Sequence, residues 1–137
     1  MLGKMKKSLI VFLILFIVPI LSKATSIGGL ISTNTSLNGK INIISDVNIA
    51  SGVTLTFEAG SVLIFEEGIC LSTQSSGHIL FNGTAVSKIT ISPRIQGTFL
   101  GKIESAGAGS TMEMHFVQMH GGHINVITGA TALIEDS

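Results

Sequence analysis

The densest group of potential ligand side chains lies between Met112 and His123, in the sequence MEMHFVQMHGGH. His120 and His123 flank a Gly-Gly pair, so both imidazoles can reach one ion, with His115 or Glu113 as a third ligand. The spacing matches no established zinc motif, and histidines at an open corner fit an ordinary polar surface equally well. His115, His120 and His123 are therefore speculative metal ligands, and we predict no cofactor.

Carboxylates for acid–base catalysis are not brought together by the sequence. Asp46 and Asp136 are the only aspartates and lie far apart. Glu66 and Glu67 are adjacent, but neighbouring residues of a strand point to opposite faces. Cys70 is the only cysteine, so no internal disulfide forms, and without a basic neighbour it is interpreted as a small, half-buried strand residue. We predict no catalytic residue.

Composition limits the class of protein. The chain has 137 residues, which allow one domain at most, and its 45% hydrophobic and 12% charged residues exclude a disordered chain. Sixteen glycines supply turn formers, while Trp and Tyr are absent. This mixture favours short strands joined by frequent corners.

The N-terminus has the pattern of a secretory signal peptide. Lysines within residues 4–7 precede an apolar run from Leu9 to Leu21, which is shorter than the roughly 20 residues that a membrane-spanning helix needs. Ser22 and Ala24 are small residues at the spacing that a signal peptidase reads. We therefore expect residues 1–24 to be removed, a secreted or cell-surface location, and membrane contact only during export.

Removal of that segment changes the charge. The mature chain keeps four basic and eight acidic residues, a net charge of −4. A nucleic-acid interface requires clustered Lys and Arg, and the remaining bases are scattered. Nucleic acid is therefore excluded as a partner. The basic residues that remain are Lys40, Lys88, Arg94 and Lys102.

The mature chain is a succession of short β-like segments. Residues 25–39 are rich in Gly, Ser, Thr and Asn, which predicts a linker or an irregular first coil. Regular patterning begins at Lys40, and residues 40–137 are assigned to one β domain. The predicted strands are Ile41–Ile44, Val47–Ile49, Val53–Phe57, Ser61–Phe65, Ile69–Thr73, His78–Phe81, Ile89–Ser92, Thr98–Glu104, Met112–Met119 and Ile124–Ile127.

The breaks between these strands resemble corners more than hairpin turns. Only Asn38-Gly39 and Asn82-Gly83 have the two-residue hairpin sequence. If each corner turns the chain by part of a circle, successive coils stack in parallel at about 4.8 Å and their aliphatic residues form an interior column. We therefore predict an all-β parallel solenoid of about four to five coils, from roughly 20–25 residues per coil.

Several stretches resemble the right-handed parallel β-helix repeat proteins of bacterial secreted and cell-surface chains. Gly52–Ser61 (GVTLTFEAGS) resembles the family run GVTLTIEPGT, with Ala59 in place of Pro. Gly77–Thr84 (GHILFNGT) and Lys88–Ser92 (KITIS) resemble its later pieces, and Phe99–Ile103 only loosely echoes a further one. The resemblance covers roughly residues 41–122 and implies a right-handed, pectate-lyase-like helix.

Family members with this scaffold include enzymes, adhesins and passive stalks. The lyases and hydrolases among them use clustered aspartates, which this chain lacks. We therefore expect a non-catalytic structural or adhesive module that displays a sheet face to extracellular polysaccharide or to another surface protein. The alternative is a degenerate or truncated carbohydrate-active β-helix of the polysaccharide lyase kind. Ice or mineral binding by a regular Thr array is weaker still, because the Thr-x-Thr of Thr54-Leu55-Thr56 is not expected to recur on neighbouring coils.

The last residues, from Ala130 to Ser137, still look like part of a coil, and no capping helix is evident. Two explanations stay open: a shortened or partial member of a longer surface protein, or an end that self-associates with another chain.

Overall fold

The computed structural model describes residues 23–98, 101–127 and 129–137, and all of their regular structure is β. The predicted signal peptide falls almost wholly outside these residues. Within them, no helix is long and apolar enough to cross a membrane. The strands in chain order are β1 Thr25–Ile31, β2 Thr35–Leu37, β3 Lys40–Ile49, β4 Thr54–Glu58, β5 Val62–Phe65, β6 Ile69–Thr73, β7 His78–Asn82, β8 Ile89–Pro93, β9 Gly101–Ser105, β10 Thr111–His115, β11 Val117–Met119, β12 His123–Val126 and β13 Thr131–Glu135.

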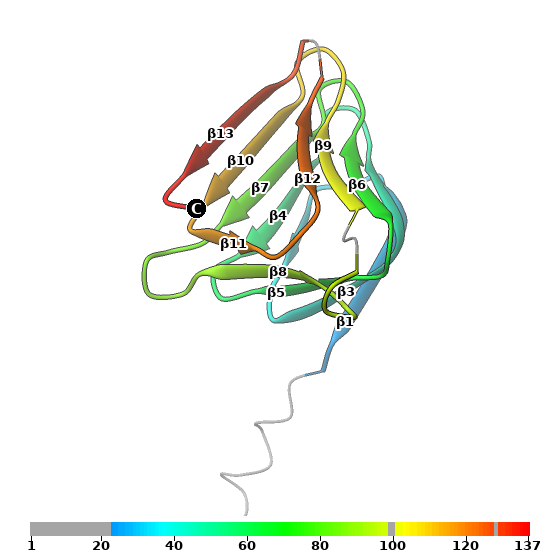
Figure 1. The fold of residues 1–137 in the computed structure, drawn as a ribbon. Helices are drawn as coiled ribbons and strands as arrows, with labels where there is room; N and C mark the ends of the chain where they lie inside the picture. Colours follow the sequence, from blue (N-terminus) through cyan, green and yellow to red (C-terminus); the bar gives the residue numbers. More distant parts are fainter. Residues whose placement is uncertain (1–22, 99–100, 128) are drawn as a thin grey trace, which may run out of the picture.

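All pairings between these strands are parallel, and they form two sheets (Figure 1). The five-stranded sheet has the order β13-β10-β7-β4-β2. The eight-stranded sheet has the order β11-β8-β5-β3-β6-β9-β12, with β1 also paired to β3. The prediction of an all-β chain of parallel strands is thus confirmed, and the strongly curled arrangement is that of a β-solenoid-like fold.

The long strand β3 joins two limbs of the eight-stranded sheet. Lys40–Ile43 pairs with β5, whereas Val47–Ile49 pairs with β6. We call β3-β5-β8-β11 the first limb and β3-β6-β9-β12 the second limb. Together with the five-stranded sheet they enclose one interior, and strands such as β4, β7, β8 and β10 alternate buried inward residues with outward ones.

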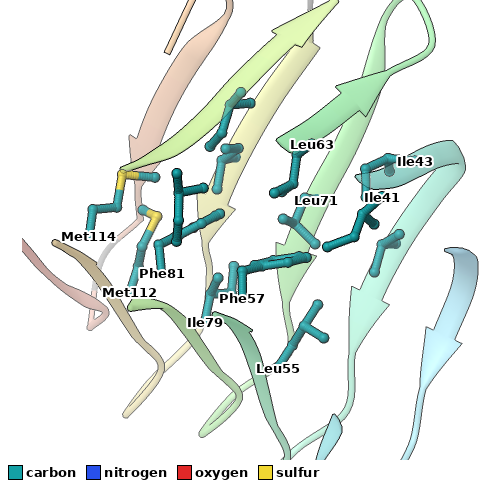
Figure 2. Packing of buried hydrophobic residues seen from close by; sticks show 14 of the residues in the cluster. Ile41, Ile43, Leu55, Phe57, Leu63, Leu71, Ile79, Phe81, Met112 and Met114 are labelled. Atoms are coloured by element: carbon teal, nitrogen blue, oxygen red, sulfur yellow. The ribbon is translucent and has the colours of Figure 1, made fainter. Parts of the chain in front are cut away.

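The interior is a set of apolar columns. Leu55, Ile79 and Met112 are register partners along the five-stranded sheet, and each is 0% exposed. Phe57 and Phe81 form the neighbouring column, with ring centroids 5.0 Å apart in a stacked arrangement. Figure 2 shows these side chains converging with those of the eight-stranded sheet. Burial of this surface is the main force that holds the parallel strands in register.

Corners between strands are formed by residues with a left-handed backbone. Gly60 and Gly68 have φ of 77° and 71°, as expected for the two corners around β5. Glu66 beside the second corner pairs with Arg94 on the following layer, with Nε–Oε1 at 2.5 Å. After the corner before β4, Val53, Leu55 and Phe57 point inward and are at most 8% exposed.

The predicted strands need correction in three places. Ile41–Ile44 and Val47–Ile49 are parts of one continuous strand, β3. Met112–Met119 is not one strand, because Phe116 has φ 50° and makes a corner between β10 and β11. Val117 consequently points inward, at 3% exposure, instead of sharing the face of His115. Thr98 belongs to a turn in which its N–H donates to the carbonyl of Ile95, and β9 is described from Gly101 to Ser105.

The predicted strands did not include β1, β2 or β13. β1 and β2 lie within residues 25–39, where a linker or an irregular first coil was predicted, and they pair with β3 and β4. β13 pairs with β10 over five residues.

Candidate functional site

The histidines of the Met112–His123 segment are placed in different parts of the fold. His115 ends β10 in the five-stranded sheet, His120 follows β11, and His123 begins β12 in the second limb. The corners at Phe116 and at the Gly-Gly pair separate them. Among the residues that the structure describes, no group of three or more His, Cys, Asp or Glu is arranged to hold a metal ion.

His115 instead lies between two carboxylates on the outer face of the five-stranded sheet. Its Nε2 is 3.4 Å from Oε2 of Glu113, and its Nδ1 is 3.3 Å from Oε2 of Glu135. The carboxylates approach opposite edges of the ring, so they are not positioned to share one ion with either nitrogen. The contact with Glu135 connects β10 to β13, the next strand of this sheet.

Two rows of mixed polar groups lie on the second limb. Cys70, Lys102 and His123 are register partners on β6, β9 and β12. A second row lies two residues further along β6, β9 and β12, and it extends to β3. This second row contains Asn48, Ser72, Glu104 and Asn125. The intervening residues Leu71 and Ile103 are 0% exposed, which directs both polar rows to the outer face.

Glu104 binds side chains of both rows through its carboxylate. Its Oε2 accepts hydrogen bonds from Nζ of Lys102 at 2.7 Å and from Nδ2 of Asn125 at 2.9 Å. Although the residue is only 8% exposed, the hydrogen bond from Lys102 outweighs the effect of burial and lowers the pKa of the carboxyl. The same hydrogen bond raises the pKa of Lys102, so both groups are charged at neutral pH.

Cys70 is less suited to nucleophilic chemistry. Its backbone N–H donates to Oδ1 of Asp46 at 2.8 Å, which places a carboxylate near the strand. Partial burial raises the pKa of the thiol, and the nearby Lys102 only partly opposes this. A thiol with a raised pKa is protonated at neutral pH and is a weak nucleophile. This agrees with its interpretation as a half-buried strand residue.

A hollow of about 530 Å³ lies beside these rows. Its lining residues are Gly68, Cys70, Gly101, Lys102, His123, Ile124 and Asn125. Gly101 is required there, because it has φ 104° and a Cβ at this position would overlap the backbone of Ile69. The hollow therefore combines a floor without a side chain, a charged ammonium group, an imidazole and an amide.

A second hollow, of about 770 Å³, lies on the first limb. Its lining residues are Thr90, Ser92, Pro93, Gln96, Gly97, Thr98, His120 and Gly121. His120 is the only titratable side chain among these lining residues. The hollow can offer hydrogen bonds to a ligand but few charges.

The outer face of the five-stranded sheet differs in charge. Its strands contain no Lys or Arg, and Glu58, Glu113 and Glu135 lie on them. A row of small polar groups crosses the same face, where Nδ1 of His78 is 2.6 Å from Oγ1 of its register partner Thr111. The row consists of Thr54, His78, Thr111 and Thr131.

Sequence reasoning did not identify the rows of the second limb. From the sequence alone, Lys102 is one of four scattered basic residues and Glu104 is the end of a predicted strand. The connecting segments differ in length, so register partners recur at unequal intervals, as from Cys70 to Lys102 and then to His123. The available signal was the polar residue at alternate positions of each predicted strand, but spacing alone does not align these positions.

Comparison with known proteins finds no match to the chain, whether among family models, curated proteins or solved structures.

Proposed function

We propose that this chain is an exported, non-catalytic β-solenoid module that binds extended polysaccharide through the outer face of its second limb. In this proposal the fold is a right-handed parallel β-helix of about four to five coils, as its resemblance to β-helix repeat proteins implies. The signal-peptide pattern supports export to a secreted or cell-surface location.

The observation that carries the proposal is the continuous polar row from Asn48 to Asn125. It crosses four neighbouring parallel strands, so one polar group follows another about every 4.8 Å along the stack. A linear glycan also presents hydroxyl groups at regular intervals along its length, and such a polymer can contact successive strands in the same way. Amide, hydroxyl and carboxylate groups provide both donors and acceptors for these hydroxyls.

The hollow beside the row supports the same ligand class. It offers Lys102, His123 and Asn125 next to the exposed edge of Ile124, so a sugar ring can place its hydroxyls on the polar groups and its C–H face on the apolar one. The protonated thiol of Cys70 and the charged Lys102 provide neither a nucleophile nor a general base at neutral pH. These properties favour binding without turnover.

The test uses a matched pair of substitutions on the two sheets. Ser72→Arg places a long side chain on the outward row of the second limb, and Thr56→Arg places the same side chain on the five-stranded sheet. We expect the unsubstituted chain to bind members of a panel of immobilised neutral and acidic polysaccharides. Ser72→Arg should weaken that binding by about tenfold or more, equivalent to about 1.4 kcal/mol, while Thr56→Arg leaves it unchanged.

Binding to no polysaccharide of the panel, or equal weakening by both substitutions, would contradict the proposal. Incubation of the chain with uronic-acid polymers and Ca²⁺ separates the lyase alternative. A rise in ultraviolet absorbance from unsaturated products would replace binding alone with polysaccharide lyase activity.

A further inference from the structure

The two Asn-Gly pairs of the chain lie in opposite structural settings. Asn38-Gly39 connects β2 to β3, whereas Asn82-Gly83 follows directly from the ladder between β7 and β10. Their local chemistry is the same, since in each pair an asparagine amide precedes a residue without a side chain. Any difference in their reactivity must therefore come from the fold.

The reaction available to such a pair is an intramolecular cyclisation. The backbone nitrogen of the glycine attacks Cγ of the asparagine, a new C–N bond forms, and the side-chain amide leaves as ammonia with the proton from the attacking nitrogen. Water then opens the resulting succinimide at either carbonyl, which yields aspartate or isoaspartate. The nitrogen must first be free to rotate toward Cγ, and glycine permits this rotation best.

Asn82 is held away from that geometry. Its register partners are Glu58 and His115 on the strands at either side. The N–H of Gly83 donates to the carbonyl of His115 at 3.0 Å, so the attacking nitrogen is already engaged. The carbonyl of Phe116 also faces Gly83, 2.8 Å from the position of a Cβ. Cyclisation here requires local opening of the β7–β10 ladder.

Asn38 lies in an open turn. Asn38, Gly39 and Lys40 are all exposed, and Gly39 has φ 75° with no atom within 4 Å of the position of a Cβ. The carbonyl of Gly39 accepts a hydrogen bond from the N–H of Val62 at 2.9 Å. That bond engages the carbonyl of Gly39 and not the nitrogen that attacks Cγ of Asn38.

We propose that Asn38 is a site of spontaneous covalent modification, where the folded chain converts asparagine to aspartate and isoaspartate, and that Asn82 is protected from the same reaction. Conversion adds a negative charge beside Lys40 and, in the isoaspartate form, an extra carbon in the main chain at the entrance to β3. Both changes act where β3 begins its pairing with β5.

The experiment compares the two sites within one molecule. The chain is incubated in warm, mildly alkaline buffer, and peptides that contain Asn38 or Asn82 are quantified over time by mass spectrometry and an isoaspartate assay. In the folded chain we expect Asn38 to react at least about tenfold faster than Asn82, because Asn82 reacts only from an opened state. In concentrated denaturant the two rates should become similar.

Each remaining outcome is decisive. Equal rates in the folded chain, an absence of reaction at Asn38, or a difference that persists in denaturant would overturn the proposal. Asn38→Gln is the matched control, because the longer side chain closes a less favourable ring and should abolish the product at this position while Asn82 behaves as before. Circular dichroism establishes that the unsubstituted chain and the control are equally folded during the incubation.

Discussion

One interior column of the five-stranded sheet passes through two different environments. Phe57, Phe81 and Met114 are register partners with exposures of 0%, 0% and 1%, whereas the next partner, Ile134 on β13, is 47% exposed. All four occupy the same position of their strands. The difference teaches that alternation selects the inward direction of a side chain, but neighbouring strands on both sides are needed to bury it.

The outer face of the second limb shows the same dependence on neighbours. Glu104, between β6 and β12, is 8% exposed and receives two hydrogen bonds, while its partner Asn125 on β12 is exposed. A middle strand therefore shields polar groups as well as apolar ones. Charge interactions are stronger there because less water screens them.

The largest effect should come from the middle of the interior column. Phe81→Ala removes the ring stacked on Phe57 and leaves a cavity, so we expect a loss of about 3–5 kcal/mol in the free energy of unfolding. Ile134→Ala, at a half-exposed position, should cost about 1 kcal/mol. Chemical denaturation of both variants measures the contrast. Similar losses for the two substitutions would show that neighbouring strands do not determine how much a side chain of this column contributes to the free energy of unfolding.

Gly101 extends the comparison to the backbone. Gly101→Ala adds a Cβ that overlaps the backbone of Ile69 and requires φ 104°, so we expect a loss of about 2–5 kcal/mol from overlap and strain combined. Gly39→Ala is the matched control, because its φ is 75° but no atom lies near the added carbon, and strain alone should cost about 1–2 kcal/mol. Thermal denaturation should rank the two. The reverse order would contradict the close approach of β9 to β6.

Glu104 should produce the smallest effect, together with a pH dependence. Its carboxyl has a lower pKa in the folded chain than in the unfolded chain, so the stability it contributes is present above the unfolded value and disappears as the pH falls through the folded value. Glu104→Gln should lose about 1 kcal/mol at neutral pH. The variant should also depend less on pH below about 4.5 than the unsubstituted chain does. Urea denaturation as a function of pH tests this, and parallel acid dependence in both chains would refute it.

Much of the local structure could be predicted from residue patterns. Alternating aliphatic residues identified most strands, and the breaks between predicted strands contain the glycine corners at Gly60 and Gly68. The pattern failed at Phe116, because a non-glycine residue with positive φ interrupts an otherwise continuous alternation. The pattern also did not predict β13, a short segment that forms a strand by pairing with β10. Local sequence does not contain the energy of that pairing.

The candidate site could be predicted far less well. The three histidines that are close in the sequence lie on different strands or corners of the fold. Glu104 instead accepts hydrogen bonds from Lys102 on its own strand and from Asn125 on β12. The histidines suggested a site because they are close in the sequence. The group of Lys102, Glu104 and Asn125 could not be found from spacing, because the segments that connect its strands differ in length. Register, which depends on the packing of all layers together, determines which outward residues become neighbours.

The sequence by itself determined that this is an all-β chain, which residues of most strands face inward, and where glycine corners occur, because these properties depend on hydrophobic alternation and backbone sterics within a few residues. Only the tertiary structure decided which strands pair, that Glu104 is shielded while Ile134 is not, and that Asn38 lies open while Gly83 is bonded to His115. These properties arise from contacts between residues far apart in the chain, whose free energy is gained only when the layers assemble.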